Sequence, residues 1–499
     1  MTIVQVVVQL LLQIVVAPVV LRFAGQNALG AFAAIVQCLA YMLAIDVGFY
    51  AMVVKYLAGA YGRGGVGPEF MTVVVTARRF FGWANIGYAI LIAVFATNAG
   101  RWLNLPPAEA EQARSGLWWL AGWTLIRVPF LVASFALYSV QDLAARNGIA
   151  VAGSVLRFAV TLALVVAGFG LTGLIAGYII NDVVEHGGSW LRFRSVHPGA
   201  GRFAARHDAA LLRGMLKLSI STLLIVVGSR VLYFSDNLIV GMLVSAAAAS
   251  VYYTTQLPAT FGWLTINRLT ENAAPAINEI HARAEPARLR SVYLKLHRYV
   301  FLVSLPFATG LLLFNEAVVS RWVGPGQFGG QALTAGLAIV SLGVTSGCVD
   351  YAFLLASGAV QRYALVFAAA AVLKCALSLW LCQRFGPVGV VFATAPAALM
   401  YVAYGQRSMR RRLAISQREF LARCLRPVLP AVALAAALVA PWVWYAPAGR
   451  WWELAGQVTV FLLVYAGMAW HGLLPEEHRA AREKWLTGWA AVRGRAERA

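Results

Sequence analysis

Residues 149–190 read IAVAGSVLRFAVTLALVVAGFGLTGLIAGYIINDVVEHGGSW. The segment contains two apolar runs of about 20 residues, the length at which an α-helix crosses a bilayer. The short turn Phe169-Gly170-Leu171-Thr172-Gly173 separates the two runs, and glycine is common in such turns. The segment therefore predicts two consecutive membrane helices, near 149–168 and 171–190.

The same pattern extends over the whole chain. Of its 499 residues, 61% are hydrophobic and 12% are charged, and the mean hydropathy is +0.72. Soluble domains are about 25% charged. The composition therefore predicts an all-α polytopic membrane protein. The apolar runs place fourteen transmembrane helices near 3–21, 29–50, 79–99, 116–138, 149–168, 171–190, 215–235, 239–263, 297–315, 332–356, 364–383, 388–406, 428–445 and 453–472.

The basic residues predict the orientation of these helices. Of the 41 Lys and Arg residues, 31 fall in one set of loops and in the C-terminal tail, and only 6 fall in the opposite loops. Because cytoplasmic loops carry the excess of Lys and Arg, we expect both termini to face the cytoplasm. Basic loops also suit the anionic lipids of the inner leaflet. They explain the net charge of +21 without nucleic acid as a partner.

A second turn of the same type indicates an internal repeat. Phe385-Gly386-Pro387-Val388-Gly389 lies between the eleventh and twelfth predicted spans, as the first turn lies between the fifth and sixth. When the first six spans are shifted by the separation of the two turns, they fall close to spans seven to twelve. We therefore predict two parallel six-helix lobes, at 1–214 and 215–410, followed by two extra helices and a basic tail at 411–499. Repeat transporters bind their substrates at the interface between the repeats.

Four cations lie well inside apolar runs: Arg127, Arg157, Arg230 and Lys374. A charge at this depth is costly and usually faces a protein interior or a water-filled cavity. Each cation is therefore either a contact for anionic cargo or half of an internal ion pair. Arginine presents a planar fork of donors that matches phosphate oxygens. Pro129 follows Arg127 and predicts a kink in that span.

Several acidic residues are candidate partners for these cations. Asp182 and Glu185 lie in the span after Arg157, so either could pair with it. Asp350 is a candidate partner for Lys374. Alternatively, Lys374 snorkels to the membrane interface or binds phosphate.

Three carboxylates are placed near predicted span ends. Asp46 and Asp350 are either interfacial or sites for a coupling Na⁺ or proton. We interpret Asp236 as a helix-end or interfacial group. The sequence has no CxxC pair, no histidine spacing typical of a metal site and no phosphate-binding P-loop. We therefore expect no catalytic residue, no metal centre and no cofactor.

The order of several short motifs resembles that of a known family. The motifs are Leu29-Gly30-Ala31-Phe32, Asp46-Val47-Gly48, Ser235-Asp236-Asn237-Leu238-Ile239-Val240-Gly241, Val251-Tyr252-Tyr253, Pro275, Arg321-Trp322-Val323-Gly324 and the glycine turn at 385–389. Over residues 1–410 the chain resembles Wzx-type polysaccharide flippases of the multidrug/oligosaccharidyl-lipid/polysaccharide (MOP) superfamily.

This resemblance implies a two-lobed fold with alternating access. It also implies the substrate, an oligosaccharide on a polyprenyl pyrophosphate that moves from the inner to the outer leaflet of a bacterial cytoplasmic membrane. The product would be a surface polysaccharide such as the O-antigen of lipopolysaccharide, a capsule or an exopolysaccharide. The implied partners are the lipid-linked glycan, membrane lipids and the polysaccharide polymerase or export machinery.

Two alternatives stay open. A multidrug or metabolite exporter of the same superfamily would carry cationic cargo, which calls for intramembrane acids rather than cations. A membrane polymerase or ligase for the same glycans would need a sizeable outer loop with catalytic groups, and the sequence contains none. We therefore expect a transporter rather than an enzyme.

Overall fold

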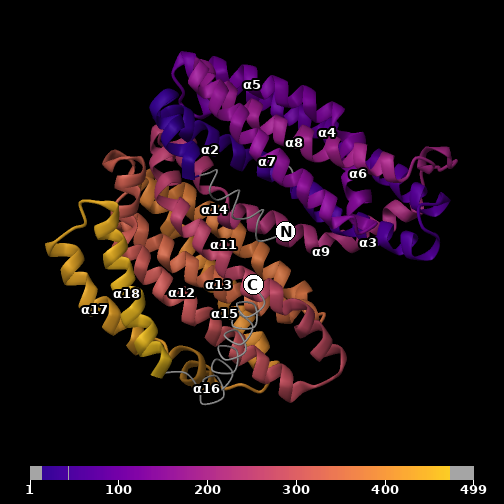
Figure 1. The fold of residues 1–499 in the computed structure, drawn as a ribbon. Helices are drawn as coiled ribbons and strands as arrows, with labels where there is room; N and C mark the ends of the chain where they lie inside the picture. Colours follow the sequence, from indigo (N-terminus) through magenta and orange to yellow (C-terminus); the bar gives the residue numbers. More distant parts are fainter. Residues whose placement is uncertain (1–13, 43, 472–499) are drawn as a thin grey trace, which may run out of the picture. The chain divides into compact units, whose positions relative to one another are not determined.

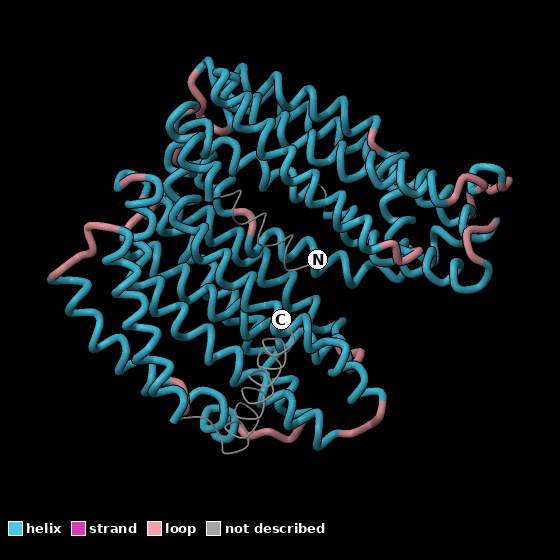
Figure 2. The backbone as a smooth tube through the Cα atoms, in the orientation of Figure 1, coloured by secondary structure: helices cyan, strands magenta, loops and turns pink. Residues whose placement is uncertain are grey.

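The computed structural model describes residues 14–42 and 44–471, and all regular secondary structure in these ranges is helical (Figure 2). Seven helices of the described part are long and apolar enough to cross a membrane, or up to ten if each of three bent pairs is one span. The predicted all-α polytopic class is therefore confirmed. The count of fourteen remains a prediction. Most of the first predicted span, 3–21, and both termini lie outside the described residues.

The helices occupy the apolar runs in order. Their bounds are α2 Gly25–Met42, α3 Ala44–Gly64, α4 Pro68–Trp102, α5 Pro107–Ile126, α6 Val128–Ser139, α7 Leu143–Leu164, α8 Gly170–Val196, α9 Ala209–Tyr233, α10 Asp236–Leu243, α11 Ala246–Ala282, α12 Pro286–Val323, α13 Gln331–Ala356, α14 Val360–Phe385, α15 Pro387–Arg412, α16 Gln417–Phe420, α17 Leu429–Tyr445 and α18 Trp451–His471. Short irregular helical segments lie at 165–169, 200–202, 325–327 and 421–425.

The structure differs from the predicted spans around residue 235. The sequence predicts a boundary between spans at 235–239, because Ser235, Asp236 and Asn237 are polar. Instead, the chain bends by 49° between α9 and α10 and turns at Val244–Ser245 before α11. The polar residues are buried at the bend. Ser235 and Asp236 are internal because the buried Lys374 bonds to both, as described below.

The chain forms two compact units. The first comprises the described parts of Met1–Leu257 together with Trp322–Gly336 and Val360–Tyr401, and the second comprises Pro258–Arg321, Leu337–Ala359 and the described part of Val402–Ala499. Within the first, α4, α5, α7 and α8 lie side by side (Figure 1). In the second, α17 and α18 pack on each other and share an apolar core with α12. The division into lobes at 214 and 410 remains a prediction.

The two repeat-related glycine turns share a backbone feature. Gly170 opens α8 with φ +45°, and Gly386 precedes α15 with φ +61°. This left-handed region favours glycine because a side chain there is strained. A positive φ at the first glycine of both turns agrees with the proposed repeat.

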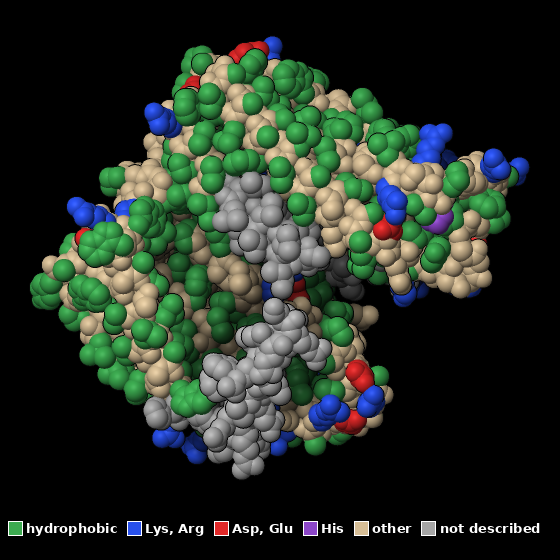
Figure 3. All heavy atoms as spheres, viewed as in Figure 1, with side chains coloured by type: hydrophobic (Ala, Val, Ile, Leu, Met, Phe, Trp, Pro, Cys, Tyr) green, Lys and Arg blue, Asp and Glu red, His purple; other side chains and the backbone are tan. Residues whose placement is uncertain are grey.

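The protein surface has the polarity of a membrane protein. On the face drawn in Figure 3, hydrophobic side chains cover the helix sides, and many charged side chains lie near helix ends and loops. Val372 is 71% exposed and Trp83 is 69% exposed, which suits contact with lipid.

An exposed carboxylate begins α9. Asp208 accepts hydrogen bonds from the backbone N–H groups of Ala210 and Leu211 at 2.8 and 3.0 Å. These bonds hold the pKa of Asp208 below its usual value. The residue is therefore an N-cap that satisfies the first turn of the helix.

Candidate functional site

Arg127 lies at a sharp break between two helices of the first unit. α5 ends at Ile126, α6 begins at Val128, and their axes differ by 61°. Pro129 lacks a backbone N–H, so one helical hydrogen bond is lost at this point. The predicted kink is present, and it places the Arg127 side chain among α3, α4 and α8.

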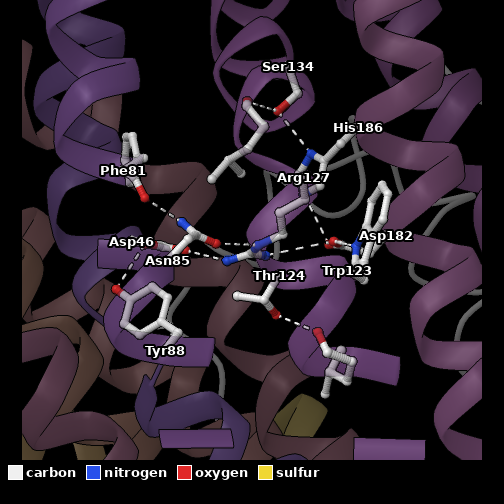
Figure 4. A network of polar contacts seen from close by, with 12 residues as sticks. Asp46, Phe81, Asn85, Tyr88, Trp123, Thr124, Arg127, Ser134, Asp182 and His186 are labelled. Carbon is white, nitrogen blue, oxygen red and sulfur yellow. Dashed lines mark hydrogen bonds and ion pairs between the residues drawn. The ribbon is translucent and has the colours of Figure 1, made fainter. Parts of the chain in front are cut away.

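The guanidinium group of Arg127 lies among an amide and two carboxylates (Figure 4). Its Nε donates to Asn85 Oδ1 at 2.7 Å, and its Nη2 donates to Asp46 Oδ2 at 2.9 Å. Its Nη1 lies 3.7 Å from Asp182 Oδ2. Tyr88 donates to the other oxygen of Asp46 at 3.0 Å. We call Asp46, Asn85, Tyr88, Arg127, Asp182 and the residues that bond to them the Arg127 network.

The position of Asp46 differs from its predicted place near a span end. It lies in the first turn of α3 and is 7% exposed. The predicted span ends at residue 50, but helix α3 continues to Gly64. The apolar run therefore covers only the first part of this helix. The buried ion pair with Arg127 accounts for a carboxylate in this position.

Helix α8 completes the Arg127 network. Trp123 Nε1 donates to Asp182 Oδ2 at 2.6 Å. His186 Nε2 lies 3.1 Å from Asp182 Oδ1, and His186 Nδ1 lies 3.2 Å from Ser134 Oγ. Glu185, the other predicted partner on this helix, forms no ion pair within residues 14–42 and 44–471.

Lys374 also has a carboxylate partner. Its Nζ lies 2.5 Å from Asp236 Oδ1 and bonds to Ser235 Oγ. Tyr252 donates to Asp236 Oδ2 at 2.6 Å. Lys374 is fully buried. The pair therefore fixes the bend between α9 and α10 against α14, and Asp236 is a buried partner rather than an interfacial group.

The two remaining cations lie against aromatic rings instead. The Arg157 guanidinium lies 5.5 Å from the ring centre of Tyr178, and the Arg230 guanidinium lies 5.0 Å from that of Phe234. Tyr178 on α8 interacts electrostatically with both arginines. Neither arginine forms an ion pair in the described part of the chain, and Arg230 Nε is buried with no hydrogen-bond partner there. We call Arg157, Arg230 and Tyr178 the Tyr178 cluster.

A cavity beside the Arg127 network extends to Tyr178. Its lining includes Tyr178, Trp123, Arg127 and Asp182. Tyr178, Asp182 and His186 are spaced four residues apart on α8, so they lie on one face of that helix. That spacing is the sequence signal that would have pointed to Tyr178 and His186. Asn85, Tyr88, Trp123, Ser134 and Tyr252 carried no comparable signal.

The second unit buries its own polar group. Asp350 on α13 accepts a hydrogen bond from Tyr293 at 2.7 Å, and His297 Nε2 lies 3.6 Å from the same Asp350 oxygen. Phe420 packs on the His297 ring at 5.1 Å between ring centres. The predicted pairing of Asp350 with Lys374 is therefore wrong. Asp350 is buried on α13, and the ion pair of Lys374 is with Asp236.

Comparisons with known proteins identify the fold. Residues 81–325 match the family described as "Polysaccharide biosynthesis protein". An inward closed structure of the lipid II flippase MurJ matches with a TM-score of 0.67 at 14% identity, covering 94% of this chain and 98% of that one. The chain shares its fold with this flippase.

Solved structures of multidrug transporters give similar matches. A multidrug resistance MATE family transporter in an inward-facing conformation gives a TM-score of 0.66 at 14% identity, with 81% of this chain and 95% of that one covered. Its outward-facing form gives 0.55 at 15% identity, with 82% and 95% covered. No curated protein matches the chain in sequence. At the level of the fold, these matches agree with the resemblance seen in the sequence.

Proposed function

We propose that this chain flips polyprenyl-pyrophosphate-linked oligosaccharides from the inner to the outer leaflet of a bacterial cytoplasmic membrane, by alternating access, for surface polysaccharide synthesis. The match to a polysaccharide biosynthesis family and the fold shared with a lipid II flippase support the proposal. The observation that carries it is the Tyr178 cluster, where two half-buried arginines approach one tyrosine with no carboxylate partner in the described residues.

The charge of the Tyr178 cluster suits a pyrophosphate. Two guanidinium groups that lack an anionic partner among the described residues leave donors for phosphate oxygens, and arginine can bind such oxygens in bidentate fashion. A hydrogen bond to a charged group contributes about 1.5–3 kcal/mol, or roughly 10- to 100-fold in affinity. A cationic drug would be repelled by the same two side chains.

The other two cations have a different proposed role. Arg127 and Lys374 are each neutralised by carboxylates at 2.9 and 2.5 Å, so a phosphate would have to displace those partners. Breaking a buried pair costs about 3–5 kcal/mol. We therefore assign Arg127 and Lys374 to holding the two helix bends, and Arg157 and Arg230 to the cargo.

Reconstitution of the purified chain tests the function. Vesicles would contain the protein and a fluorescent polyprenyl pyrophosphate that carries a short oligosaccharide, and a membrane-impermeant quencher would report which leaflet holds the lipid. We expect the protein to equilibrate the lipid between leaflets much faster than protein-free vesicles do. Equal rates in the two preparations would overturn the proposal.

Deletion of the gene distinguishes a flippase from a polymerase or ligase that acts on the same glycan. Loss of a flippase should leave the lipid-linked unit in the inner leaflet and reduce surface polysaccharide. Accumulation in the outer leaflet would instead indicate a polymerase or ligase. Transport of cationic drugs with an unchanged surface glycan would indicate a multidrug exporter.

A further inference from the structure

The connection between α15 and α17 carries an excess of positive charge. Residues 407–426 contain one acidic residue, Glu419, and seven arginines: Arg407, Arg410, Arg411, Arg412, Arg418, Arg423 and Arg426. On the face drawn in Figure 3, several Lys and Arg side chains lie around the end of the second unit that carries α16. The distribution of basic residues along the sequence predicts that this connection faces the cytoplasm. There it meets the inner leaflet, whose surface is anionic.

The single carboxylate of this connection already has cationic partners. Glu419 Oε2 accepts a hydrogen bond from Arg290 Nη2 on α12 at 2.6 Å, and Glu419 Oε1 lies 3.5 Å from Arg423 Nε. The other six arginines of the connection form no ion pair with the part of the chain that the structure describes. The connection therefore keeps a net positive charge, which an anion from outside the chain can neutralise.

An aromatic ring, rather than an acid, holds Arg410. Its guanidinium lies 5.9 Å from the ring centre of Phe420 on α16, and its Nε is buried with no hydrogen-bond partner among the described residues. The chain reverses at Ala414, whose φ is +52°, and the Ile415 N–H donates to the Arg410 backbone oxygen at 2.8 Å. The end of α15 therefore lies against α16. A guanidinium over a ring is positioned by that ring and keeps the donors at its edge for an anion.

The segment after this turn has a buried side and an exposed apolar side. Residues 417–425 are helical and are bent by 46° from α17. Phe420 and Cys424 are buried, and Cys424 Sγ donates to the Leu294 backbone oxygen of α12 at 3.3 Å. Leu421 and Leu429 are 41% and 45% exposed. Exposed leucines among arginines are typical of a helix that lies in the membrane interface.

We propose that the connection between α15 and α17 binds the phosphate of an anionic phospholipid of the inner leaflet. Arg410 and Arg418 donate to the phosphate oxygens, which suit the planar fork of an arginine. Arg418 precedes Leu421 by three residues, so the two lie on one face of the helix, and Leu421 contacts the acyl chains. A soluble phosphate would meet the same arginines but not use the leucines. This lipid site is separate from the cargo contacts under the proposed function.

Native mass spectrometry of the chain in detergent, with phosphatidylglycerol added, tests the site without any cargo. Phosphatidylcholine, which has no net charge, is the comparison lipid. We expect the wild type to retain phosphatidylglycerol in preference to phosphatidylcholine. Each arginine near an anionic lipid contributes about 5-fold in affinity. Arg410→Gln/Arg418→Gln should therefore bind phosphatidylglycerol roughly 25-fold more weakly. Equal retention of the two lipids by the wild type would overturn the proposal.

Arg78→Gln/Arg79→Gln is the matched control, because both of its arginines are exposed on α4 and it loses the same charge. We expect the control to bind phosphatidylglycerol like the wild type. An equal loss in both double variants would indicate a diffuse attraction to basic loops and overturn the site. If Arg410→Gln/Arg418→Gln fails to fold, Arg418→Gln alone decides, because Arg418 is exposed. Wild-type affinity in that single variant would overturn the proposal.

Competition distinguishes a lipid from a soluble phosphate. Inorganic phosphate, or the phosphatidylglycerol headgroup without its acyl chains, is added to the protein that holds phosphatidylglycerol. We expect neither compound to displace the lipid at millimolar concentration. Displacement by either would show that the acyl chains contribute no affinity, and would overturn the lipid assignment. Because no cargo is present, these results are independent of the proposed flipping function, which the vesicle assay decides separately.

Discussion

Arg127 and Arg157 are both cations in the middle of apolar runs, but their surroundings differ. Arg127 is bonded to an amide and to one carboxylate, and lies 3.7 Å from a second. Arg157 lies over an aromatic ring and has no anionic partner in the described residues. Burial of a cation alone therefore does not identify a cargo contact. A buried cation is structural when a protein carboxylate neutralises it. A cation without such a partner is a candidate to bind cargo.

The same contrast holds between Lys374 and Arg230. Lys374 bonds to Asp236 and Ser235 at a helix bend, whereas Arg230 lies over Phe234 with its Nε buried and without a hydrogen-bond partner among the described residues. Two cations thus stabilise bends in the backbone, and two are left for an external anion. Substitution of a paired cation should therefore lower the stability of the fold, whereas substitution of an unpaired cation should lower transport.

The largest expected effect is the loss of Arg127. Replacing it by methionine leaves Asp46 and Asp182 without their shared cation, and removal of one partner from a buried pair costs about 3–5 kcal/mol. We expect Arg127→Met to lower the unfolding temperature in detergent and the yield of folded protein. Arg157→Met is the matched substitution and should unfold close to the wild type. Equal unfolding temperatures for the two variants would break the comparison.

A smaller net effect is expected when both members of the second pair are replaced. Lys374→Met should destabilise the protein because Asp236 stays buried without a cation. Adding Asp236→Asn removes that charge, so the double variant should recover much of the lost stability. Thermal unfolding of the two single variants and the double variant measures the coupling. Strict additivity of the three values would show that the pair contributes no mutual stabilisation.

Transport should respond to the unpaired cations. We expect Arg157→Gln and Arg230→Gln each to reduce the flipping of the lipid-linked oligosaccharide by roughly 10-fold or more, since each removes a charge-assisted contact of about 1.5–3 kcal/mol. Arg384→Gln is the control. Arg384 also lies against an aromatic ring, 5.1 Å from the ring centre of Trp380, but it is at the end of α14, away from the bend between α9 and α10. A loss of rate in the control as large as in the other two would contradict the assignment.

The smallest effect is expected at an exposed carboxylate. Asp208 caps α9 through backbone hydrogen bonds that lower its pKa, so the stability it contributes is present above the pKa of the unfolded chain. That contribution is lost as the pH falls through the lowered folded pKa. Asp208→Ala should therefore reduce stability slightly at neutral pH and remove part of its acid dependence. An unfolding curve at pH 7 identical to that of the wild type would exclude the capping role.

The sequence predicted the all-α polytopic class because the bilayer sets the length of the apolar runs. It did not predict which polar groups meet. Arg157 and Asp182 were expected to pair because only one short turn separates their helices. In the α7–α8 hairpin, however, Arg157 is level with Gly177, while Gly153 is level with Asn181. That register places Tyr178, rather than Asp182, beside Arg157.

The bends were predictable to different degrees. Pro129 predicted the kink after Arg127, because proline removes a helical hydrogen bond. Nothing in the sequence around Ser235 distinguished a bend within a span from a turn between spans. Only packing shows that Lys374, 138 residues later, neutralises Asp236. Pairs of this kind depend on tertiary contacts, which local patterns do not encode.

The most direct measurement compares ligand-induced stabilisation in variants of the Tyr178 cluster. A ligand that binds only the folded state raises its stability by about 2.7 kcal/mol at 100 times the dissociation constant. The account predicts that a polyprenyl pyrophosphate raises the unfolding temperature of the wild type and of Arg384→Gln. It predicts that Arg157→Gln/Arg230→Gln unfolds like the free wild type but loses this shift. A double variant that keeps the full shift would contradict the central claim that the unpaired arginines bind the cargo.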